Sequence, residues 1–206
     1  MTDAESGALL RQIPGDEALS MARILDRMQG MTGAELLQST DQRTLERIFQ
    51  EYGELPRTFA FVRALVERRS RASLQTTTDV KEVATLVYKH DASKYLPQIF
   101  QAVRIAVNDE LGALEHLLSV APTMLKAGGR LGIISFHSLE DRIVKQFIND
   151  EKNRDTLPSN FPIRSEELPK PRLNIVTKPI RPSDDEVKHN PRSRSGIMRV
   201  AERTAY

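Results

Sequence analysis

The 206-residue sequence contains no cysteine, which excludes disulfide bonds and cysteine-ligated metal sites. No group of His, Asp and Glu has the spacing of metal ligands either, so we expect no metal centre. The sequence also lacks an apolar run near the ~20 residues that a membrane span needs. Its start is polar, with Asp3, Glu5 and Arg11, unlike a signal peptide. We therefore expect a cytoplasmic protein with no membrane partner.

Glycine is present at ten positions, but never in the arrangement of a cofactor-binding loop. A G-x-G-x-x-G run after an apolar strand is typical of such loops, because the backbone must approach the cofactor closely. Gly128 and Gly129 precede an apolar run instead of following one. We assign no cofactor-binding residue in this sequence.

Charge is unevenly distributed along a chain whose formal net charge is only +2. Residues 1–56 have a net charge of −5, whereas residues 57–71 and residues 164–206 each have +4. Local basic surfaces of this kind are typical of proteins that face nucleic-acid phosphates. In residues 57–71 the candidate phosphate ligands are Arg68, Arg69 and Arg71. The alternative is that these are ordinary solvated helix faces and tails.

Residues 16–90 are expected to form an all-helical subdomain, preceded by a flexible N-terminus at residues 1–15. Met21, Ile24, Leu25 and Met28 have the i, i+3, i+4, i+7 spacing of a helix. Thr32 and Glu35 fit a capping box at the start of the next helix. Further helices are predicted up to Gly53, from about residue 56 to the arginine run, and from residue 78 or 79. Their expected inward residues are Leu45, Ile48, Phe49, Tyr52, Phe59, Val62, Val66, Val80, Val83, Ala84 and Val87.

Residues 91–206 alternate between helical and strand patterns, which predicts an α/β domain. The longest helix is expected to begin at Pro97 and to end near Pro122. A short strand at residues 131–134, covered on both faces, is followed by a helix at about residues 139–149. Residues 150–172 are read as a connection, and two more strands are predicted at residues 173–179 and 197–201. A sheet of about three strands would leave an open edge.

Polar side chains cluster directly after the predicted strand at residues 131–134. Ser135, His137 and Ser138 come first, followed by Glu140 and Asp141. Ligands of open α/β sheets bind beyond the carboxyl ends of the strands, so this is the expected site. The alternative for His137 is a loop histidine bonded to backbone. The alternative for Glu140 and Asp141 is a favourable interaction with the dipole at a helix start. Asp141 could also pair with Arg142 or Arg104.

Residues 134–145, Ile-Ser-Phe-His-Ser-Leu-Glu-Asp-Arg-Ile-Val-Lys, resemble the signature of the RsmH (MraW) family. Residues 100–111 and 190–203 resemble that family's preceding helix and closing strand. The resemblance covers most of the chain and corresponds to about the C-terminal two thirds of a family member. It implies part of a Rossmann-like class I methyltransferase sheet with an inserted helical subdomain that faces RNA. It also implies methylation of N4 of a cytidine in small-subunit ribosomal RNA, with S-adenosylmethionine as the cofactor.

The resemblance further implies roles for particular residues. Ser135, His137 and Ser138 are expected to orient the target base, because catalysis at an exocyclic amine depends on positioning. A second group, expected to line the site or to contact RNA phosphate, comprises Arg104, Asn108, Asp109, Asn190, Arg192 and Arg194. Ordinary ion pairs on a solvated helix, and a soluble turn, are the respective alternatives.

Three readings of the function remain open from the sequence. The chain is an S-adenosylmethionine-dependent methyltransferase of the RsmH type, truncated or with its cofactor-binding half supplied elsewhere. Alternatively, it is a non-catalytic RNA-binding or ribosome-assembly module, or a gene fragment without a role. Because no cofactor loop is found, we expect weak or no binding of S-adenosylmethionine by this chain alone.

Overall fold

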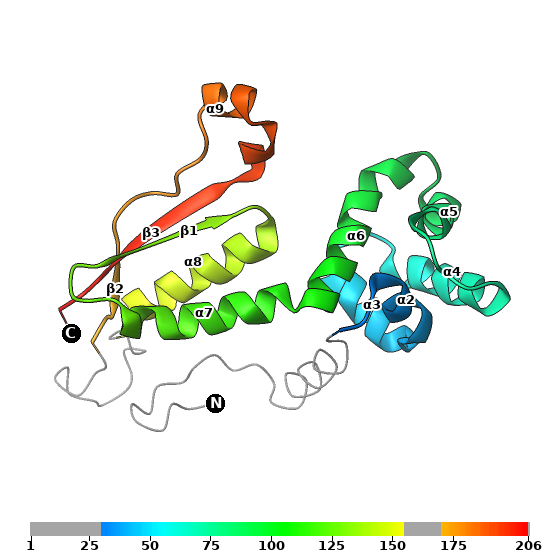
Figure 1. Cartoon of the computed structure of the whole chain (residues 1–206), viewed down its shortest axis with the longest axis horizontal. Helices are drawn as coiled ribbons and strands as arrows, with labels where there is room; N and C mark the ends of the chain where they lie inside the picture. The colour runs from blue at the N-terminus through cyan, green and yellow to red at the C-terminus, as the bar shows by residue number, and fades with distance from the viewer. Residues whose placement is uncertain (1–29, 155–169, 206) are drawn as a thin grey trace, which may run out of the picture. The chain divides into compact units, whose positions relative to one another are not determined.

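The computed structural model describes residues 30–154 and 170–205. These residues form two compact units, one ending at Glu110 and the other beginning at Leu111. We call residues 30–110 the helical unit, and residues 111–154 with 170–205 the sheet unit (Figure 1). The flexible N-terminus expected at residues 1–15 and the helix expected around Met21 and Met28 lie outside the described residues.

The helical unit consists of short helices whose starts are fixed by side-chain caps. They are α2 (Gly33–Ser39), α3 (Gln42–Glu51), α4 (Thr58–Arg71), α5 (Thr77–Tyr88), the 3-10 turn η1 (Lys89–Asp91) and α6 (Ala92–Asn108). The predicted capping box is confirmed: the Thr32 hydroxyl accepts from the amide of Glu35, whose carboxylate accepts from the Thr32 amide. Asp41 caps α3. A second capping box at Thr76 starts α5 at Thr77, one or two residues before the predicted position.

One apolar core joins all the helices of this unit. Phe49 and Phe61 meet edge to face at a centroid distance of 5.0 Å, and the buried face of α6 contributes Ile99 and Ala102. The expected inward residue Phe59 is instead 64% exposed. Because α6 packs into this core, the helical unit extends to Glu110 and does not end near residue 90.

The long helix expected between Pro97 and Pro122 is two helices in the structure. The first, α6, begins five residues before Pro97 at Ala92, and the second is α7 (Glu110–Met124). Asp109 separates them with φ 47°, a left-handed conformation in which an α-helix cannot continue. The apolar periodicity runs through both helices, so it does not reveal the interruption.

The sheet unit contains α7, β1 (Arg130–Ser135), α8 (Ser138–Lys152), β2 (Leu173–Ile175), α9 (Asp184–His189), the 3-10 turn η3 (Pro191–Ser195) and β3 (Ile197–Arg203). The three strands lie in the order β1-β3-β2, and both strand pairs are antiparallel. Ser135 is opposite Ile197, and Arg130 is opposite Glu202. An isolated bridge between Ile180 and Met198 extends the pairing beyond β2.

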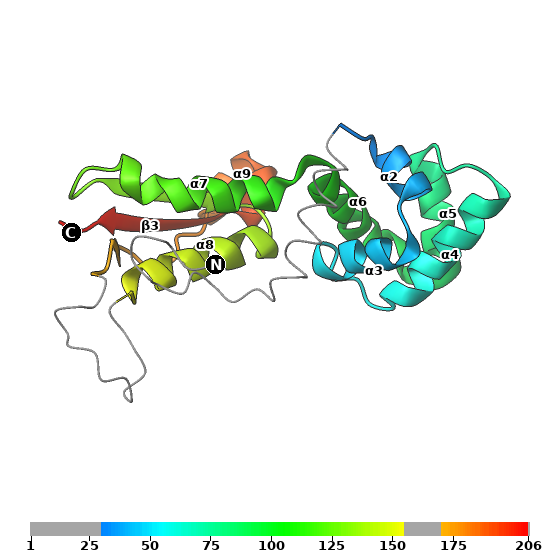
Figure 2. The same ribbon diagram turned by 90° about the horizontal axis from the view of Figure 1, so that it is seen from below.

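One face of the sheet is covered by α7 and α8, which run alongside β3 in both views (Figure 1, Figure 2). Leu131 and Ile133 of β1 pack there against a buried cluster that includes Leu118 of α7 and Val144 of α8. On the opposite face Ile134 is 57% exposed. The expectation that this strand is covered on both faces is therefore wrong for the described residues. Because β1 is an edge strand, its hydrogen-bonding edge is open within the described sheet.

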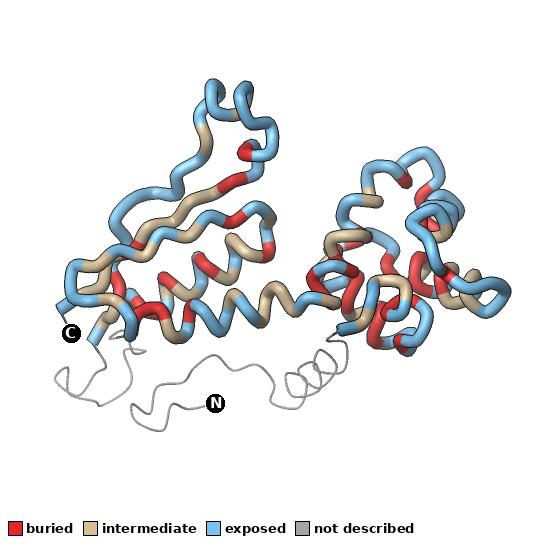
Figure 3. The backbone as a smooth tube through the Cα atoms, viewed as in Figure 1, coloured by how far each residue is buried: buried red, intermediate tan, exposed pale blue. Residues whose placement is uncertain are grey.

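The buried residues belong to the cores of the two units. Exposed residues lie along the outer helix faces, on β1 and in the segment around α9 (Figure 3). In the described ranges no helix is long and apolar enough to cross a membrane.

Candidate functional site

The polar loop after β1, residues 135–138, is here called the signature loop. It is held at the start of α8 by a reciprocal cap. The Glu140 carboxylate accepts from the amides of Phe136 at 2.8 Å and His137 at 3.4 Å. In return the Nδ1 atom of His137 accepts from the Glu140 amide at 3.4 Å. His137 is thus the N-cap residue of α8, where Ser, Thr, Asn or Asp is more usual.

Two polar atoms of the signature loop are buried and have no hydrogen-bond partner among the described residues: Ser135 Oγ and His137 Nε2. Because Nδ1 of His137 accepts a hydrogen bond from the Glu140 amide, the hydrogen of a neutral imidazole ring is on Nε2. That nitrogen lies 3.3 Å from Glu140 Oε1, but without the geometry of a hydrogen bond. Buried polar groups are nearly always satisfied, so two unsatisfied atoms in one loop call for a functional explanation.

Asp141 ties the first turn of α8 to the central strand. Its carboxylate oxygens accept from Arg199 Nε at 2.8 Å and Nη2 at 2.9 Å, a two-pronged pairing that suits the planar guanidinium. This bonding with Arg199 lowers the pKa of Asp141, against the effect of burial, and the charges of Arg181 and Lys145 add to it. The structure thus pairs Asp141 with Arg199, a partner that the sequence did not suggest.

A basic turn adjoins the signature loop through the sheet. Residues 190–196, here called the Asn190 turn, lead directly into β3, where Ile197 is opposite Ser135. The Asn190 side chain accepts from the Arg192 amide at 3.2 Å, and the buried Ser193 hydroxyl donates to the Asn190 carbonyl at 2.8 Å. A Cβ atom at Gly196 would lie 3.8 Å from the Phe136 ring. Asn190 is thus occupied in shaping the turn.

The exposed groups of this region include Arg192, Arg194 and the ring of Phe136, which is 53% exposed. Within the described ranges the two arginines have no ion-pair partner within 4.0 Å. The structure thus brings together the expected residues of the signature loop and of the Asn190 turn.

The expected site residues Arg104, Asn108 and Asp109 lie in the helical unit. Arg104 donates to Glu110 from Nε at 2.8 Å and from Nη2 at 3.0 Å. Asn108 donates to the same carboxylate at 3.2 Å. Asp109 provides the left-handed residue between α6 and α7. These contacts organise the junction of the two helices, which is the alternative role given above.

The arginine run at the end of α4 also has internal partners. Arg68 pairs with Asp79 at 2.9 Å, and Arg71, whose side chain is 74% exposed, pairs with Glu67. One nitrogen of Arg69 donates to the carbonyls of Leu37 and Thr40, both at 2.7 Å. Arg69 therefore satisfies carbonyls at the C-terminal end of α2, where a cation also interacts favourably with the helix dipole. Of the three, Arg71 is the one most open to a phosphate.

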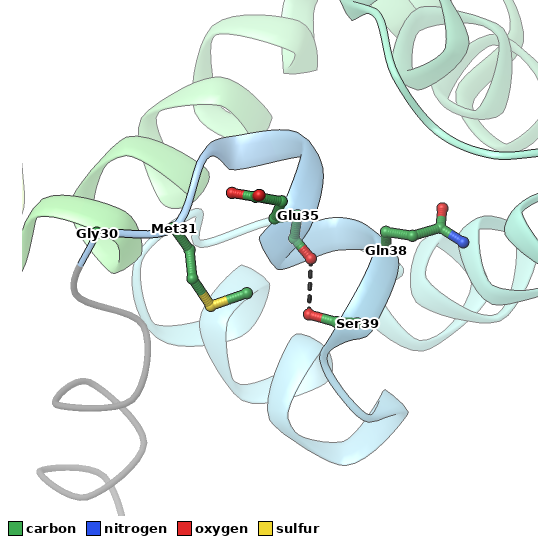
Figure 4. A pocket seen from close by; sticks show the side chains of 5 residues that line it. All are labelled: Gly30, Met31, Glu35, Gln38 and Ser39. Carbon is green, nitrogen blue, oxygen red and sulfur yellow. Dashed lines mark hydrogen bonds between the residues drawn. The ribbon is translucent and has the colours of Figure 1, made fainter.

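A pocket of about 410 Å³ lies beside α2 (Figure 4). It is lined by Gly30, Met31, Glu35, Gln38 and Ser39. Its polar groups are engaged: the Ser39 hydroxyl donates to the Glu35 carbonyl at 2.8 Å, and Gln38 accepts from the Leu74 amide at 3.0 Å. None of the residues expected to be functional lines it.

The described residues do not fit S-adenosylmethionine. The sheet they form has only antiparallel pairs, and β1 leads into the signature loop without a glycine. In that part of the chain no parallel strand end presents a glycine-rich turn or an acidic partner for a ribose. The same residues contain no group of three His, Asp or Glu side chains able to hold a metal ion.

Comparison with known proteins places the chain in a family. The sequence profile described as the MraW methylase family matches residues 14–204. The chain belongs to this family. It is 45% identical over 184 residues to the ribosomal RNA small subunit methyltransferase H of Methylobacillus flagellatus, covering 88% of the chain and 57% of that relative.

Other members of the family give the same picture. The protein of the same name from Methylococcus capsulatus is 44% identical, with 88% of the chain and 60% of the relative covered. The one from Dechloromonas aromatica is 39% identical, with 98% and 64% covered. The chain therefore spans about three fifths of the length of these curated relatives.

Sequence reasoning missed several residues of the site. Arg199 is bonded to a residue 58 positions away, and no local pattern indicates this pair. The exposure of Phe136 was equally hidden, because an aromatic residue after an apolar strand is more often buried. A signal was available for α9: Ser183 caps it, three acids occupy its first turn, and Lys188 and His189 its last.

Proposed function

We propose that this chain provides the RNA-binding and base-positioning part of an S-adenosylmethionine-dependent methyltransferase that acts on small-subunit ribosomal RNA. The observation that carries the proposal is the pair of unsatisfied buried atoms, Ser135 Oγ and His137 Nε2, in one rigidly capped loop. Membership of the MraW methylase family and the names of its relatives support it. On this reading the target is N4 of a cytidine.

The chemistry of that target suits the signature loop. A cytosine presents an exocyclic amine as donor, with a ring nitrogen and a carbonyl as acceptors. A hydroxyl can bond to either kind of group, and an Nε2–H can donate to an acceptor. Ser135 and His137, with Ser138 at the start of α8, would thus orient the base, while the exposed Phe136 ring offers a surface for stacking. Precise orientation of the reacting amine can supply a large part of the rate.

The RNA backbone would be held by exposed cations. In the sheet unit these include Arg192 and Arg194, which lie on the Asn190 turn beside the signature loop. In the helical unit the open candidate is Arg71, whereas Arg68 and Arg69 have partners within the fold. We propose that the helical unit is the subdomain that faces RNA and that the protein acts in the cytoplasm.

The proposed function differs from that of a self-sufficient enzyme in how the cofactor is bound. Because the described residues offer no cradle for S-adenosylmethionine, we propose that the chain alone does not bind it usefully. This point also favours the second candidate function, a non-catalytic RNA-binding or ribosome-assembly module. Both functions require RNA binding, and only the first requires the unsatisfied atoms of the signature loop to matter for methyl transfer.

Two titrations of the purified chain test the proposal. Binding to a transcribed small-subunit ribosomal RNA fragment, followed by fluorescence anisotropy, should be saturable and should weaken with salt. Calorimetric titration with S-adenosylmethionine should give no saturable heat at micromolar concentrations. Absence of RNA binding would reject both candidate functions, and micromolar cofactor binding would show that the chain holds a complete cofactor site.

A further inference from the structure

The surroundings of Asp141 contain more positive charge than this one carboxylate neutralises. Both of its oxygens are taken by Arg199, so that pair is electrically complete. Lys145 and Arg181 are also close enough to act on the charge of Asp141. Lys145 and Arg181 are both exposed to solvent. The result is a local excess of cations next to the signature loop.

The positions of these two cations follow from the fold. Lys145 is four residues after Asp141 on α8, and residues at this spacing lie on the same face of a helix. Arg181 follows Ile180, which exchanges two 2.8 Å backbone hydrogen bonds with Met198, the residue before Arg199. The alternation of an extended chain then turns Arg181 to the side of the sheet on which Arg199 meets α8.

The acidic side chains considered as partners of Lys145 and Arg181 are Glu140 and the three acids of α9, and they interact with other groups. Glu140 binds the amides of the signature loop. Asp185 of α9 pairs with Lys188 at 3.2 Å, and all three acids of that helix stand in its first turn, where the dipole attracts them. Within residues 30–154 and 170–205, neither Lys145 nor Arg181 has an ion-pair partner within 4.0 Å.

We propose that Lys145 and Arg181 form a phosphate-binding site for the RNA backbone beside the signature loop. This rests on the function proposed above, since it names two contacts that hold the RNA whose base the loop receives. An arginine fork binds two phosphate oxygens, and a lysine adds a compact charge. A bound phosphate also removes the mutual repulsion of the two cations. The complete Asp141–Arg199 pair fixes the scaffold between them without competing for the anion.

Counterion release makes the proposal measurable. A protein that neutralises a phosphate releases condensed cations, so each contact contributes about 0.7 to 0.9 to the slope of log affinity against log salt. The double variant Lys145→Gln/Arg181→Gln should therefore lower the magnitude of that slope by about 1.4 to 1.8 units. Because both side chains are exposed, the far-UV circular dichroism spectrum and melting temperature should stay unchanged.

A matched control removes two positive charges from the other end of the sheet unit. Lys126 lies in the turn before β1, and Lys152 is the last residue of α8. The variant Lys126→Gln/Lys152→Gln has the same net charge as the test variant, so any general electrostatic effect is common to both. Its salt slope should equal that of the wild-type chain.

The experiment is fluorescence anisotropy with the same small-subunit ribosomal RNA fragment at several salt concentrations, on the full chain and both double variants. A slope reduced only in the Lys145/Arg181 variant is the result expected. Equal slopes for the two variants, with RNA binding by the wild-type chain intact, would overturn this site alone. A wild-type chain with no salt-dependent RNA binding would overturn both the site and the proposed function.

Discussion

The carboxylate of Asp141 and the guanidinium of Arg199 form two parallel hydrogen bonds, 2.8 and 2.9 Å long, between the first turn of α8 and the central strand β3. Their side chains are only 17% and 19% exposed. Asp141 directly follows Glu140, whose carboxylate accepts from the amides of Phe136 and His137. The pair therefore anchors the helix on which the signature loop depends. It connects the loop to the sheet as a structural support.

Substitution Asp141→Asn should destabilise the sheet unit. The amide keeps one acceptor oxygen but loses the charge, and Arg199 is left partly buried without its counterion. Hydrogen bonds to charged groups contribute about 1.5–3 kcal/mol, so we expect a loss of about 2 kcal/mol in the free energy of unfolding. Urea denaturation at pH 7 measures it. A loss below about 0.5 kcal/mol would contradict a supporting role.

The same pair should make stability depend on pH in a defined direction. The pKa of Asp141 is lowered in the folded protein, so between that value and the ordinary ~3.9 the unfolded chain binds more protons. The stabilisation is complete above the ordinary pKa and is lost as pH falls through the folded one. The stability difference between wild type and Asp141→Asn should therefore shrink below about pH 4. A difference independent of pH would show that the charge is not what matters.

Arg69 and Arg71 should behave differently although they are two residues apart. Arg69→Ala removes two 2.7 Å bonds to the carbonyls at the end of α2, and should cost about 1.5–3 kcal/mol of stability. Arg71→Ala, on an exposed side chain, should change stability by less than about 0.5 kcal/mol. Conversely, only Arg71→Ala should reduce the salt slope of RNA binding. Urea denaturation and anisotropy on both variants test this, and equal stability losses would contradict the internal role of Arg69.

Two substitutions separate the capping role of His137 from any role in binding RNA. His137→Ala removes the cap and should cost up to about 1 kcal/mol, toward the low end because the bond is 3.4 Å long. His137→Asn supplies one of the best N-cap residues, so stability should recover. If Nε2 contacts the base, His137→Asn should still weaken RNA binding. Recovery of both properties in the asparagine variant would assign His137 to capping alone.

Local patterns in the sequence predicted the starts of several helices because caps are local. The Thr32–Glu35 box needs residues only three apart, and its prediction was confirmed. The strands near residues 131, 173 and 197 were also predicted, since short apolar runs bounded by turns indicate them. A sheet of about three strands was expected, but its order β1-β3-β2 and its antiparallel pairing were not predicted.

Features that depend on distant partners were not predicted. The exposure of Ile134 follows from β1 being an edge strand with helices on one side, which its own sequence does not encode. The break at Asp109 was missed because one apolar periodicity serves two different cores, Val103 in the helical unit and Leu118 in the sheet unit. The inward direction of Arg69 depends on carbonyls about 30 residues earlier. Each of these is decided by tertiary packing, which outweighs local propensity.

For the site as well, local features were predicted from the sequence and contacts between residues were not. The signature loop was located correctly at a strand end, because the order strand, polar loop, helix is readable. The division of labour within it was not: Glu140 and His137 cap each other, and Asp141 binds Arg199. Their roles toward RNA remain predictions.

We propose that this chain supplies RNA binding and base positioning, while the cofactor is held by residues that the chain does not contribute. The most direct test joins the N-terminal part of the Methylobacillus relative to this chain and measures transfer of a labelled methyl group to small-subunit ribosomal RNA. We expect transfer by the joined protein, none by the chain alone, and a loss on the order of 100-fold for the joined protein carrying His137→Asn. Methyl transfer by the chain alone, or a folded, RNA-binding joined protein without transfer, would contradict the account.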